Sequence, residues 1–297
     1  AELVIGASIL LIRRILDKNK AAHNGVWNKD AKGSFELRGK TMGIIGYGNI
    51  GTQLSVMAEA MGMKVKFYDI ETKLPLGNAK PAKSIKDIVS SSDIISLHVP
   101  ETSQTKNLIS AEVIKQFKQG AILINYARGE VVDLEALSKA IKSKAVSGAA
   151  IDVYPLEPEK NGDAFCTPLQ GLSNVLLTPH IGGSTEEAQE NIGEDVSIKL
   201  YQYLERGVSN GSHTIPSLSL PPVDGAHRIL HIHKNVPGVL GAINTLLSKN
   251  KINIVGQYLK TNDEIGYVVL DVDSKLSKTA FDLLKEVKHT IRARMLY

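Results

Sequence analysis

Cysteine is almost absent from this sequence of 297 residues, which contains Cys166 and no other. A single thiol excludes a disulfide within the chain and a cluster of thiolate metal ligands. So low a cysteine content is typical of a protein in a reducing compartment. We therefore expect a cytoplasmic protein without a metal site.

Charge of one sign and long apolar runs are lacking as well. The 35 basic and 31 acidic residues leave a formal net charge of +4, and no basic block marks a nucleic-acid surface. The apolar stretch from Leu3 to Ile12 is too short to span a bilayer, and no basic segment precedes it as in a signal peptide. We expect neither nucleic acid nor a membrane as a partner.

Aromatic residues make up 5% of the chain, and Trp27 is its one tryptophan. Residues 1–18 read as a single helix with an almost continuous apolar face, whereas residues 19–38 are polar and irregular. Trp27 lies in this polar stretch. A tryptophan in such a place is usually a packing anchor, and a contact between subunits is the alternative.

Glycine, by contrast, is well represented, and residues 39–51 read GKTMGIIGYGNIG. An apolar strand, Met42 to Ile45, leads into Gly46, Gly48 and Gly51, and a helical segment follows. This order is the dinucleotide-binding fingerprint. Gly46 would let the chain turn, Gly48 would let a pyrophosphate approach, and Gly51 would let the helix pack on its strand. The helix N-terminus would offer its free N–H groups to the phosphates.

A second predicted strand, Val65 to Tyr68, ends in Asp69. A carboxylate at this place accepts hydrogen bonds from an adenosine ribose and repels a 2′-phosphate. Lys73 lies near, but no arginine follows closely. The sequence therefore predicts NAD rather than NADP. The alternative is a tight glycine turn beside an ordinary strand-end aspartate.

Strands and helices alternate from Lys40 onward, and several strands are short continuous apolar runs such as Ala121–Ile124. Such runs suit a parallel sheet that is covered on both faces. The sequence therefore predicts a Rossmann-like, doubly wound α/β fold. The expected strands lie near residues 42–46, 64–69, 94–98, 121–125, 147–151 and 174–177, and the helices near 50–61, 84–90, 110–117 and 133–142.

A longer helix is expected at residues 185–205, with Ser184 as its N-cap and Glu187 three residues on. The composition then changes, because residues 207–226 are rich in Gly, Ser and Pro and read as a linker.

Residues 227–297 follow a β-α-β-β-α-β pattern, with Pro237 in the first turn of the first helix. The sequence thus predicts a small ferredoxin-like domain. A domain of this kind has an open sheet edge that invites pairing with a second copy.

Three polar residues follow strands, at the edge where open α/β sheets bind their ligands. Arg128 can grip a substrate carboxylate through two hydrogen bonds. His180 is suited to take the hydroxyl proton that leaves as a hydride moves to nicotinamide. Glu157, between two prolines, would orient this imidazole and favour its charged form. The alternatives are a surface ion pair, a merely hydrogen-bonded histidine and a solvated loop.

Two further polar residues end strands. His98, in the motif SLHVP, is expected in a loop that borders the cofactor rather than in catalysis. Asp152 follows the run Ala149–Ile151 and would accept a hydrogen bond from the nicotinamide, and a turn-forming aspartate is the alternative.

Five motifs, GIIGYGNIG, SLHVP, INYARGEVVD, AAIDVYPLEP and TPHIGGST, resemble the D-isomer-specific 2-hydroxyacid dehydrogenases over residues 1 to about 206. The resemblance implies that Arg128 binds the substrate carboxylate and that His180 is the acid/base, with Glu157 as its partner. The expected cofactor-binding residues are Gly46, Gly48, Asn49, Ile50, Gly51, Asp69, His98, Val99, Pro100, Tyr126, Ala127, Arg128, Asp152, His180, Gly182 and Gly183.

The C-terminal part, HRILHIHKNVPGVLGAINTLL followed by NIVGQYL, resembles an ACT domain, a small amino-acid-sensing module. For a dehydrogenase of this family, one ACT domain implies oxidation of D-3-phosphoglycerate to 3-phosphohydroxypyruvate, the first step of serine synthesis. It also implies a homotetramer that L-serine inhibits from a site across paired ACT domains. The implied effector residues are His233, Asn235 and Asn253, and a purely structural β-α turn is the alternative.

Members of this family begin with a segment of the substrate domain that lies before the helix at Ala1. We therefore expect residues 1–206 to be an NAD-binding domain with connecting helices to an incomplete substrate domain, without the basic residues that bind the substrate phosphate. Residues 207–226 are the expected linker and residues 227–297 the ACT domain. Other hypotheses are another D-2-hydroxyacid substrate, such as glycerate or lactate, an NAD-gated non-enzymatic binding protein, and a pure amino-acid sensor.

Overall fold

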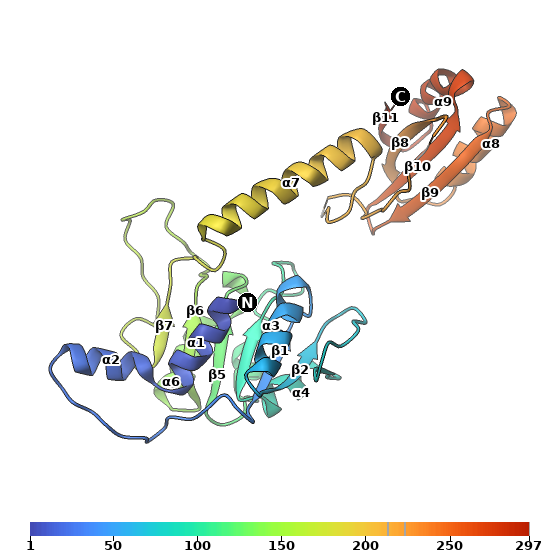
Figure 1. Ribbon diagram of the computed structural model, residues 1–297. Helices are drawn as coiled ribbons and strands as arrows, with labels where there is room; N and C mark the ends of the chain where they lie inside the picture. The colour runs from blue at the N-terminus through green and yellow to red at the C-terminus, as the bar shows by residue number, and fades with distance from the viewer. Residues whose placement is uncertain (213, 223, 297) are drawn as a thin grey trace. The chain divides into compact units, whose positions relative to one another are not determined.

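The computed structural model describes residues 1–212, 214–222 and 224–296 (Figure 1). Positions 213 and 223 of the predicted linker, and position 297 of the predicted C-terminal domain, lie outside the described residues. The chain divides into two compact units, Ala1–Ser184 and Thr185–Tyr297. Among the described residues, no helix is both long enough and apolar enough to cross a membrane.

The first unit is built on one sheet whose seven strands all run parallel, in the order β3-β2-β1-β4-β5-β6-β7. The chain moves outward from β1 to β3 and then returns to place β4 on the other side of β1. The strand order therefore reverses between β1 and β4, and doubly wound folds bind dinucleotides at the carboxyl ends of the strands at such a point. The strands are β1 Thr41–Ile45, β2 Lys64–Tyr68, β3 Lys80–Pro81, β4 Ile94–Leu97, β5 Ala121–Asn125, β6 Val146–Ile151 and β7 Val175–Leu177.

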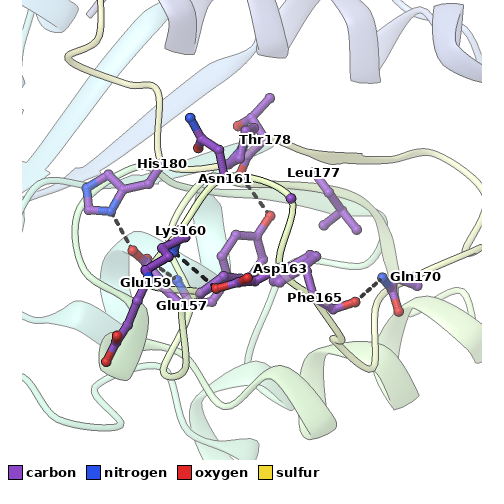
Figure 2. Close-up of a pocket in the computed structure, with 14 residues that line it drawn as sticks. Glu157, Glu159, Lys160, Asn161, Asp163, Phe165, Gln170, Leu177, Thr178 and His180 are labelled. Carbon is purple, nitrogen blue, oxygen red and sulfur yellow. Dashed lines mark hydrogen bonds and ion pairs between the residues drawn. The ribbon is translucent and has the colours of Figure 1, made fainter.

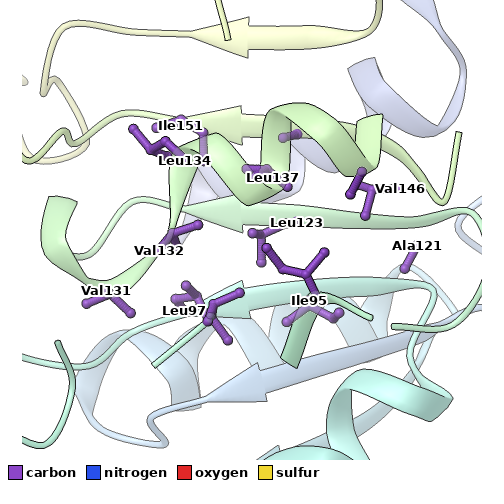
Figure 3. Close-up of a cluster of buried hydrophobic side chains, with 14 of the residues drawn as sticks. Ile95, Leu97, Ala121, Leu123, Val131, Val132, Leu134, Leu137, Val146 and Ile151 are labelled. Atoms are coloured by element: carbon purple, nitrogen blue, oxygen red, sulfur yellow. The ribbon is translucent and has the colours of Figure 1, made fainter. Parts of the chain in front are cut away.

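Helices cover both faces of this sheet. One core cluster lies between the sheet and α4, α5 and α6, where Leu97, Leu123 and Leu137 are fully buried (Figure 3). A second cluster packs α1 and α3 on the opposite face, through residues such as Leu11 and Leu54. The predicted doubly wound fold is therefore confirmed. The helices are α1 Glu2–Ile12, α2 Ile15–His23, α3 Asn49–Ala60, α4 Ile85–Ser91, α5 Ala111–Ile114, η1 Gly129–Val131 and α6 Leu134–Lys142.

The single helix predicted for residues 1–18 is wrong. α1 ends at Ile12, and Arg14 takes left-handed dihedral angles (φ 53°) before α2 begins. The Arg14 guanidinium donates hydrogen bonds to Asp17 (2.7 Å) and to Ser173 (3.0 Å), and these bonds hold the break in place. Residues 19–23, predicted as irregular, are the end of α2.

The second unit contains the long helix α7, Glu186–Arg206, and a four-stranded antiparallel sheet in the order β11-β8-β10-β9. This is the predicted ferredoxin-like arrangement. α8 and α9 cover one face of the sheet. The elements are β8 Ala226–Lys234, α8 Val239–Lys249, β9 Ile254–Thr261, β10 Ile265–Asp273, η2 Ser274–Leu276, α9 Ser277–Lys285 and β11 Thr290–Leu296.

Two predicted helix starts differ from the structure. The N-cap of α7 is Thr185, whose side chain accepts the N–H of Ala188, and not Ser184. α8 begins at Val239 behind Gly238, which has a positive φ of 94°, so Pro237 precedes the helix. Two adjacent residues that can both cap a helix are not distinguished by sequence alone.

Described residues between α7 and β8 cover the sheet face opposite the helices. Val208 and Leu220 are buried there with Leu230, Tyr267 and Val269 of the sheet. The segment therefore adds to the hydrophobic core of the second unit.

Candidate active site

The glycine-rich turn follows β1 directly and lies beside the end of β4. Gly46 has a φ of 93°, and a Cβ atom on it would lie 2.3 Å from the carbonyl oxygen of His98. A Cβ on Gly51 would lie 2.2 Å from the carbonyl oxygen of Gly46, so α3 packs directly on the turn. No atom lies within 4 Å of the corresponding point on Gly48. The turn is thus closed on the protein side and open at Gly48, as the approach of a pyrophosphate requires.

Asp69 follows β2 at the same edge of the sheet. Its carboxylate accepts the N–H of Tyr47, in the glycine turn, at 2.7 Å and the N–H of Glu71 at 2.9 Å. These bonds fix the acid beside the turn. The ammonium group of Lys73 is paired with Glu71 at 2.5 Å. A negative group therefore stands where a ribose would bind, and the nearby cation is already neutralised.

His98 follows β4 and lies beside the glycine turn. Its Nε2 atom lies 2.9 Å from the hydroxyl of Ser96. Desolvation by burial lowers the pKa of His98 from 6.5 to about 4. A ring with so low a pKa is a weak base at pH 7, which suits a residue that borders the cofactor better than one that transfers a proton.

Arg128 follows β5 and has an exposed side chain. Asn125, fully buried at the strand end, accepts the N–H of Ala127 at 3.1 Å and donates to the carbonyl oxygen of Arg128 at 2.9 Å. The guanidinium donates one hydrogen bond to the carbonyl oxygen of Ala127 (2.7 Å). Its remaining N–H groups are oriented by a rigid turn and can meet a carboxylate.

The structure brings His180 and Glu157 together. Nδ1 of His180 lies 2.8 Å from Oε2 of Glu157, while Oε1 of Glu157 accepts the N–H of Tyr154 at 2.9 Å. Partial burial favours a raised pKa for Glu157, but the hydrogen bonds from His180 and Tyr154 and the charges of His180 and Arg128 outweigh it. The pKa of Glu157 is therefore lowered. An ionised Glu157 holds the proton on Nδ1 and leaves Nε2 of His180 for chemistry.

Asp152 is fully buried and holds the turn that carries His180. Its carboxylate accepts hydrogen bonds from the Thr178 hydroxyl (2.6 Å), the Ile181 N–H (2.8 Å) and the Gly182 N–H (2.7 Å). His180 itself has a φ of 54°, a left-handed conformation that is costly for a residue other than glycine. Three bonds to one carboxylate offset that cost.

A pocket of about 520 Å³ lies beside the pair formed by Glu157 and His180. Figure 2 shows the two side chains at its wall, joined by their hydrogen bond. Residues 157–163 and the aromatic rings of Tyr154 and Phe165 are among its lining. A solvent-accessible imidazole at the wall of a pocket is a good position for a general acid or base.

The three predicted effector residues do not meet within one copy of the chain. His233 is level with Gly266 of β10, which is level with Thr261 at the end of β9. Asn253 precedes the start of β9, eight residues and roughly 25 Å from that end. Asn235 stays near His233, because its side chain donates to the carbonyl oxygen of Asn262 at 2.7 Å.

The imidazole of His233 has a defined hydrogen bond. Its Nδ1 atom lies 3.1 Å from the carbonyl oxygen of Gly266, and burial together with the charge of His289 lowers the pKa of His233. A neutral ring that donates from Nδ1 has an acceptor at Nε2.

Sequence reasoning missed Asn125, Gly129 and Tyr154, although each contacts a predicted catalytic residue or its neighbour. All three lie within the motifs INYARGEVVD and AAIDVYPLEP, but the sequence did not indicate which residues they contact. The described residues include no group of three or more His, Cys, Asp or Glu side chains that could hold a metal ion.

Comparisons with known families match both units. The model for the NAD binding domain of D-isomer specific 2-hydroxyacid dehydrogenases matches residues 5–182. A model for ACT domains like those of the AHAS small subunit matches residues 229–292.

Curated relatives cover the entire chain. It is 53% identical over 297 residues to the D-3-phosphoglycerate dehydrogenase of Haemophilus influenzae, covering 72% of that protein. It is 52% identical over 299 residues to the enzyme of the same name from Escherichia coli K12, covering 73%.

Among solved structures, the D-isomer specific 2-hydroxyacid dehydrogenase of Lactobacillus delbrueckii in its NAD-complexed form superposes with a TM-score of 0.63 at 28% identity. That match covers 69% of this chain and 65% of the solved one, so the chain spans slightly less than two thirds of it. The family model and this relative both identify NAD as the cofactor. The open face of Gly48 and the position of Asp69 fit that cofactor.

Proposed function

The chain belongs to the D-isomer specific 2-hydroxyacid dehydrogenases, which are NAD-dependent oxidoreductases, and we propose that it oxidises D-3-phosphoglycerate to 3-phosphohydroxypyruvate, the first step of L-serine biosynthesis. The 2.8 Å bond between His180 and Glu157 is the observation that carries the proposal. Such a pair supplies the base that an alcohol oxidation needs. The choice of substrate rests on the curated relatives, which are 52–53% identical.

In this proposal NAD accepts the hydride from the carbon that bears the hydroxyl group. Gly46, Gly48 and Gly51 would hold its pyrophosphate against the N-terminus of α3, and Asp69 would bind the ribose. The other residues proposed to border the cofactor are Asn49, Ile50, His98, Val99, Pro100, Tyr126, Ala127, Arg128, Asp152, His180, Gly182 and Gly183.

Arg128 would bind the substrate carboxylate with two parallel N–H groups. This contact holds the carbon next to the carboxylate in one orientation, so that its hydroxyl faces His180. The guanidinium also stabilises the 2-oxo acid as its carbonyl forms.

His180 would remove the hydroxyl proton through Nε2, because Nδ1 is bonded to Glu157. The imidazole becomes a cation in this step, and the neighbouring carboxylate stabilises that charge. Tyr154 donates its N–H to the other oxygen of Glu157 and thereby keeps the carboxylate in place.

The test is the initial rate of NAD reduction by the full-length protein with D-3-phosphoglycerate, measured beside D-glycerate and D-lactate. The proposal expects D-3-phosphoglycerate to have the highest kcat/KM. Turnover of another 2-hydroxy acid alone would keep the mechanism and overturn the substrate. If this protein binds NAD and a partner protein but turns over none of these acids, it is a non-enzymatic member of the family.

We further propose that L-serine inhibits the enzyme from a site that two copies of the chain build together. β9 is an edge strand and exposes Val255 and Leu259. Antiparallel pairing of two such edges would bring Asn253 of one copy to the Asn235 end of the other. His233 could then accept a hydrogen bond from the serine ammonium or hydroxyl group at Nε2, and the asparagine amides could donate to its carboxylate.

Mixed oligomers test this shared site. His233→Ala and Asn253→Ala each remove one side chain from every site when present alone. A mixed pair has one site that lacks both and one that is intact, so one serine site in each mixed pair should return with normal affinity. The matched control mixes His233→Ala with Asn235→Ala, which lie on the same copy's side and should restore nothing. Serine binding that no mixture restores would contradict the shared site.

The same edge pairing makes a homo-oligomer part of the proposal, with a tetramer implied by resemblance. Trp27, whose side chain is 87% exposed, is available for a second contact between subunits. A cytoplasmic location is proposed from the single cysteine. Sedimentation of the full-length protein with and without L-serine measures the assembly.

A further inference from the structure

The turns that follow β5, β6 and β7 each carry one proposed catalytic residue. Tyr154 belongs to the turn after β6 and contacts the other two turns. Its peptide group abuts Gly129, its N–H binds Glu157, and its hydroxyl donates toward the carbonyl oxygens of Ile151 (2.9 Å) and Thr178 (3.0 Å). The contact with Gly129 joins the Arg128 turn to the other two.

We propose that Gly129 is a positioning residue, whose missing side chain sets the distance from Arg128 to the pair formed by His180 and Glu157. The inference rests on the proposed function, because it assigns Arg128 to the substrate carboxylate and His180 to the hydroxyl proton.

The contact leaves no room for a side chain on Gly129. A Cβ atom there would lie 2.1 Å from the carbonyl carbon of Tyr154, 2.2 Å from its oxygen and 2.6 Å from the nitrogen of Pro155. All three neighbours are backbone atoms, so no side-chain rotation relieves the clash. Gly129 does not have a positive φ, and the requirement is therefore one of space and not of backbone conformation.

Hydrogen bonds from a buried side chain hold the turn that carries Arg128 in place. Asn125 is fully buried and bonds both to the N–H of Ala127 and to the carbonyl oxygen of Arg128. Gly129 follows at once and is buried as well. A displacement at Gly129 therefore moves Arg128 with its turn.

The turn on the other side moves as a unit with the proton-transfer pair. Tyr154 binds Glu157 through its N–H, and its hydroxyl reaches Thr178, two residues before His180. Pressure on the peptide between Tyr154 and Pro155 would therefore shift Glu157 and His180 together, and the bond between them would persist.

A methyl group at Gly129 needs a shift of about 1.3 Å, the difference between 2.1 Å and an ordinary contact of 3.4 Å. A misplacement of roughly 1 Å between reacting groups costs about 100-fold in rate. We expect Gly129→Ala to lower kcat/KM for the 2-hydroxy acid by about 100-fold, through both KM and kcat. NADH affinity should stay within about twofold of the wild-type value. Gly193→Ala, in α7 with no atom within 4 Å of its Cβ position, is the matched control and should keep full activity.

A double-mutant cycle with Arg128→Lys separates positioning from general damage. If Gly129 acts through Arg128, adding Gly129→Ala to Arg128→Lys should cost less than about fivefold. Equal losses in both backgrounds would overturn the proposal, as would Gly129→Ala with near-normal kcat/KM. If Gly129→Ala does not fold, Asn125→Asp releases the other end of the same turn, and the same cycle applies. If the wild-type protein oxidises a different 2-hydroxy acid, only the proposed substrate is refuted. The role of Gly129 is then tested by the same cycle with that acid.

Discussion

Replacing Asp152 distinguishes two roles that this residue can have, namely holding the turn that carries His180 and contacting the nicotinamide. Its carboxylate accepts three hydrogen bonds from the turn that carries His180, and the side chain is fully buried. Its other expected role is a direct contact with the nicotinamide. Asp152→Asn keeps the size of the side chain but replaces one oxygen by an NH₂ group, which cannot accept a bond.

The amide oxygen can keep the bonds from Thr178 and Ile181, and the NH₂ group then faces the N–H of Gly182. One buried donor is left without a partner, at a cost of about 1–3 kcal/mol, and the two remaining bonds lose the strength that the charge gave them. The left-handed conformation of His180 is then less well offset. Together these changes should lower the free energy of unfolding of the first unit by about 3 kcal/mol. For a unit of this size that corresponds to a fall in Tm of roughly 6–12 °C.

Thermal unfolding followed by circular dichroism, with NAD absent, measures this loss. Thr178→Val is the matched control, because it removes one donor and keeps the carboxylate and its bonds to Ile181 and Gly182. It should cost about 1 kcal/mol. The kcat of Asp152→Asn should fall together with its stability, since His180 is no longer held.

A Tm within about 1 °C of the wild-type value, together with a large loss of NAD affinity, would refute this reasoning. Asp152 would then act as a cofactor ligand, and the turn would be held by its backbone alone. A loss of both stability and affinity in Asp152→Asn, with normal affinity in Thr178→Val, would show that one residue serves both purposes.

Two further predictions concern histidines. His180→Ala should abolish most turnover and leave NAD binding intact, which initial rates and NADH fluorescence measure; near-normal kcat would exclude His180 as the base. His231 is fully buried, and desolvation lowers its pKa to about 4. As the pH falls below 6.5, the unfolded chain therefore binds a proton at His231, whereas the folded chain binds it only near pH 4. The second unit should lose up to about 3 kcal/mol of stability between pH 7 and 4. Urea unfolding at several pH values measures the slope, and His231→Gln should reduce it; an unchanged slope would contradict the assignment.

The fold was predictable because local signals and the global arrangement agree. Apolar strands followed by glycine turns or helices identify the parallel sheet from Met42 onward, and the second unit has one strand or helix for each periodic segment. The break at Arg14 was not predictable. Ile12 and Ile15 on either side of it are apolar, and no Gly or Pro marks the site. One of the two hydrogen bonds that hold the break goes from Arg14 to Ser173, far along the chain.

The candidate site, like the fold, has a part that the sequence indicated and a part that it did not. Arg128, Glu157 and His180 could be chosen because each follows a strand and has a side chain with suitable chemistry. The dependence of His180 on Asp152, and of Arg128 on Gly129, arises from contacts between segments about 25 residues apart. Such contacts are set by how the strand ends approach one another, and no local pattern encodes them.

The packing of Val208 and Leu220 on the second sheet has a consequence for the exchange of domains between genes. Tyr267 donates its hydroxyl proton to the carbonyl oxygen of Gly207 (2.6 Å), and Arg228 binds the carbonyl oxygens of Arg206 and Pro221. A recombination event that cut the gene just before β8 would transfer a sheet with one bare apolar face and an arginine stripped of two partners. A transferable cassette therefore begins at the end of α7, and a fusion to another enzyme would inherit that helix end as its point of attachment.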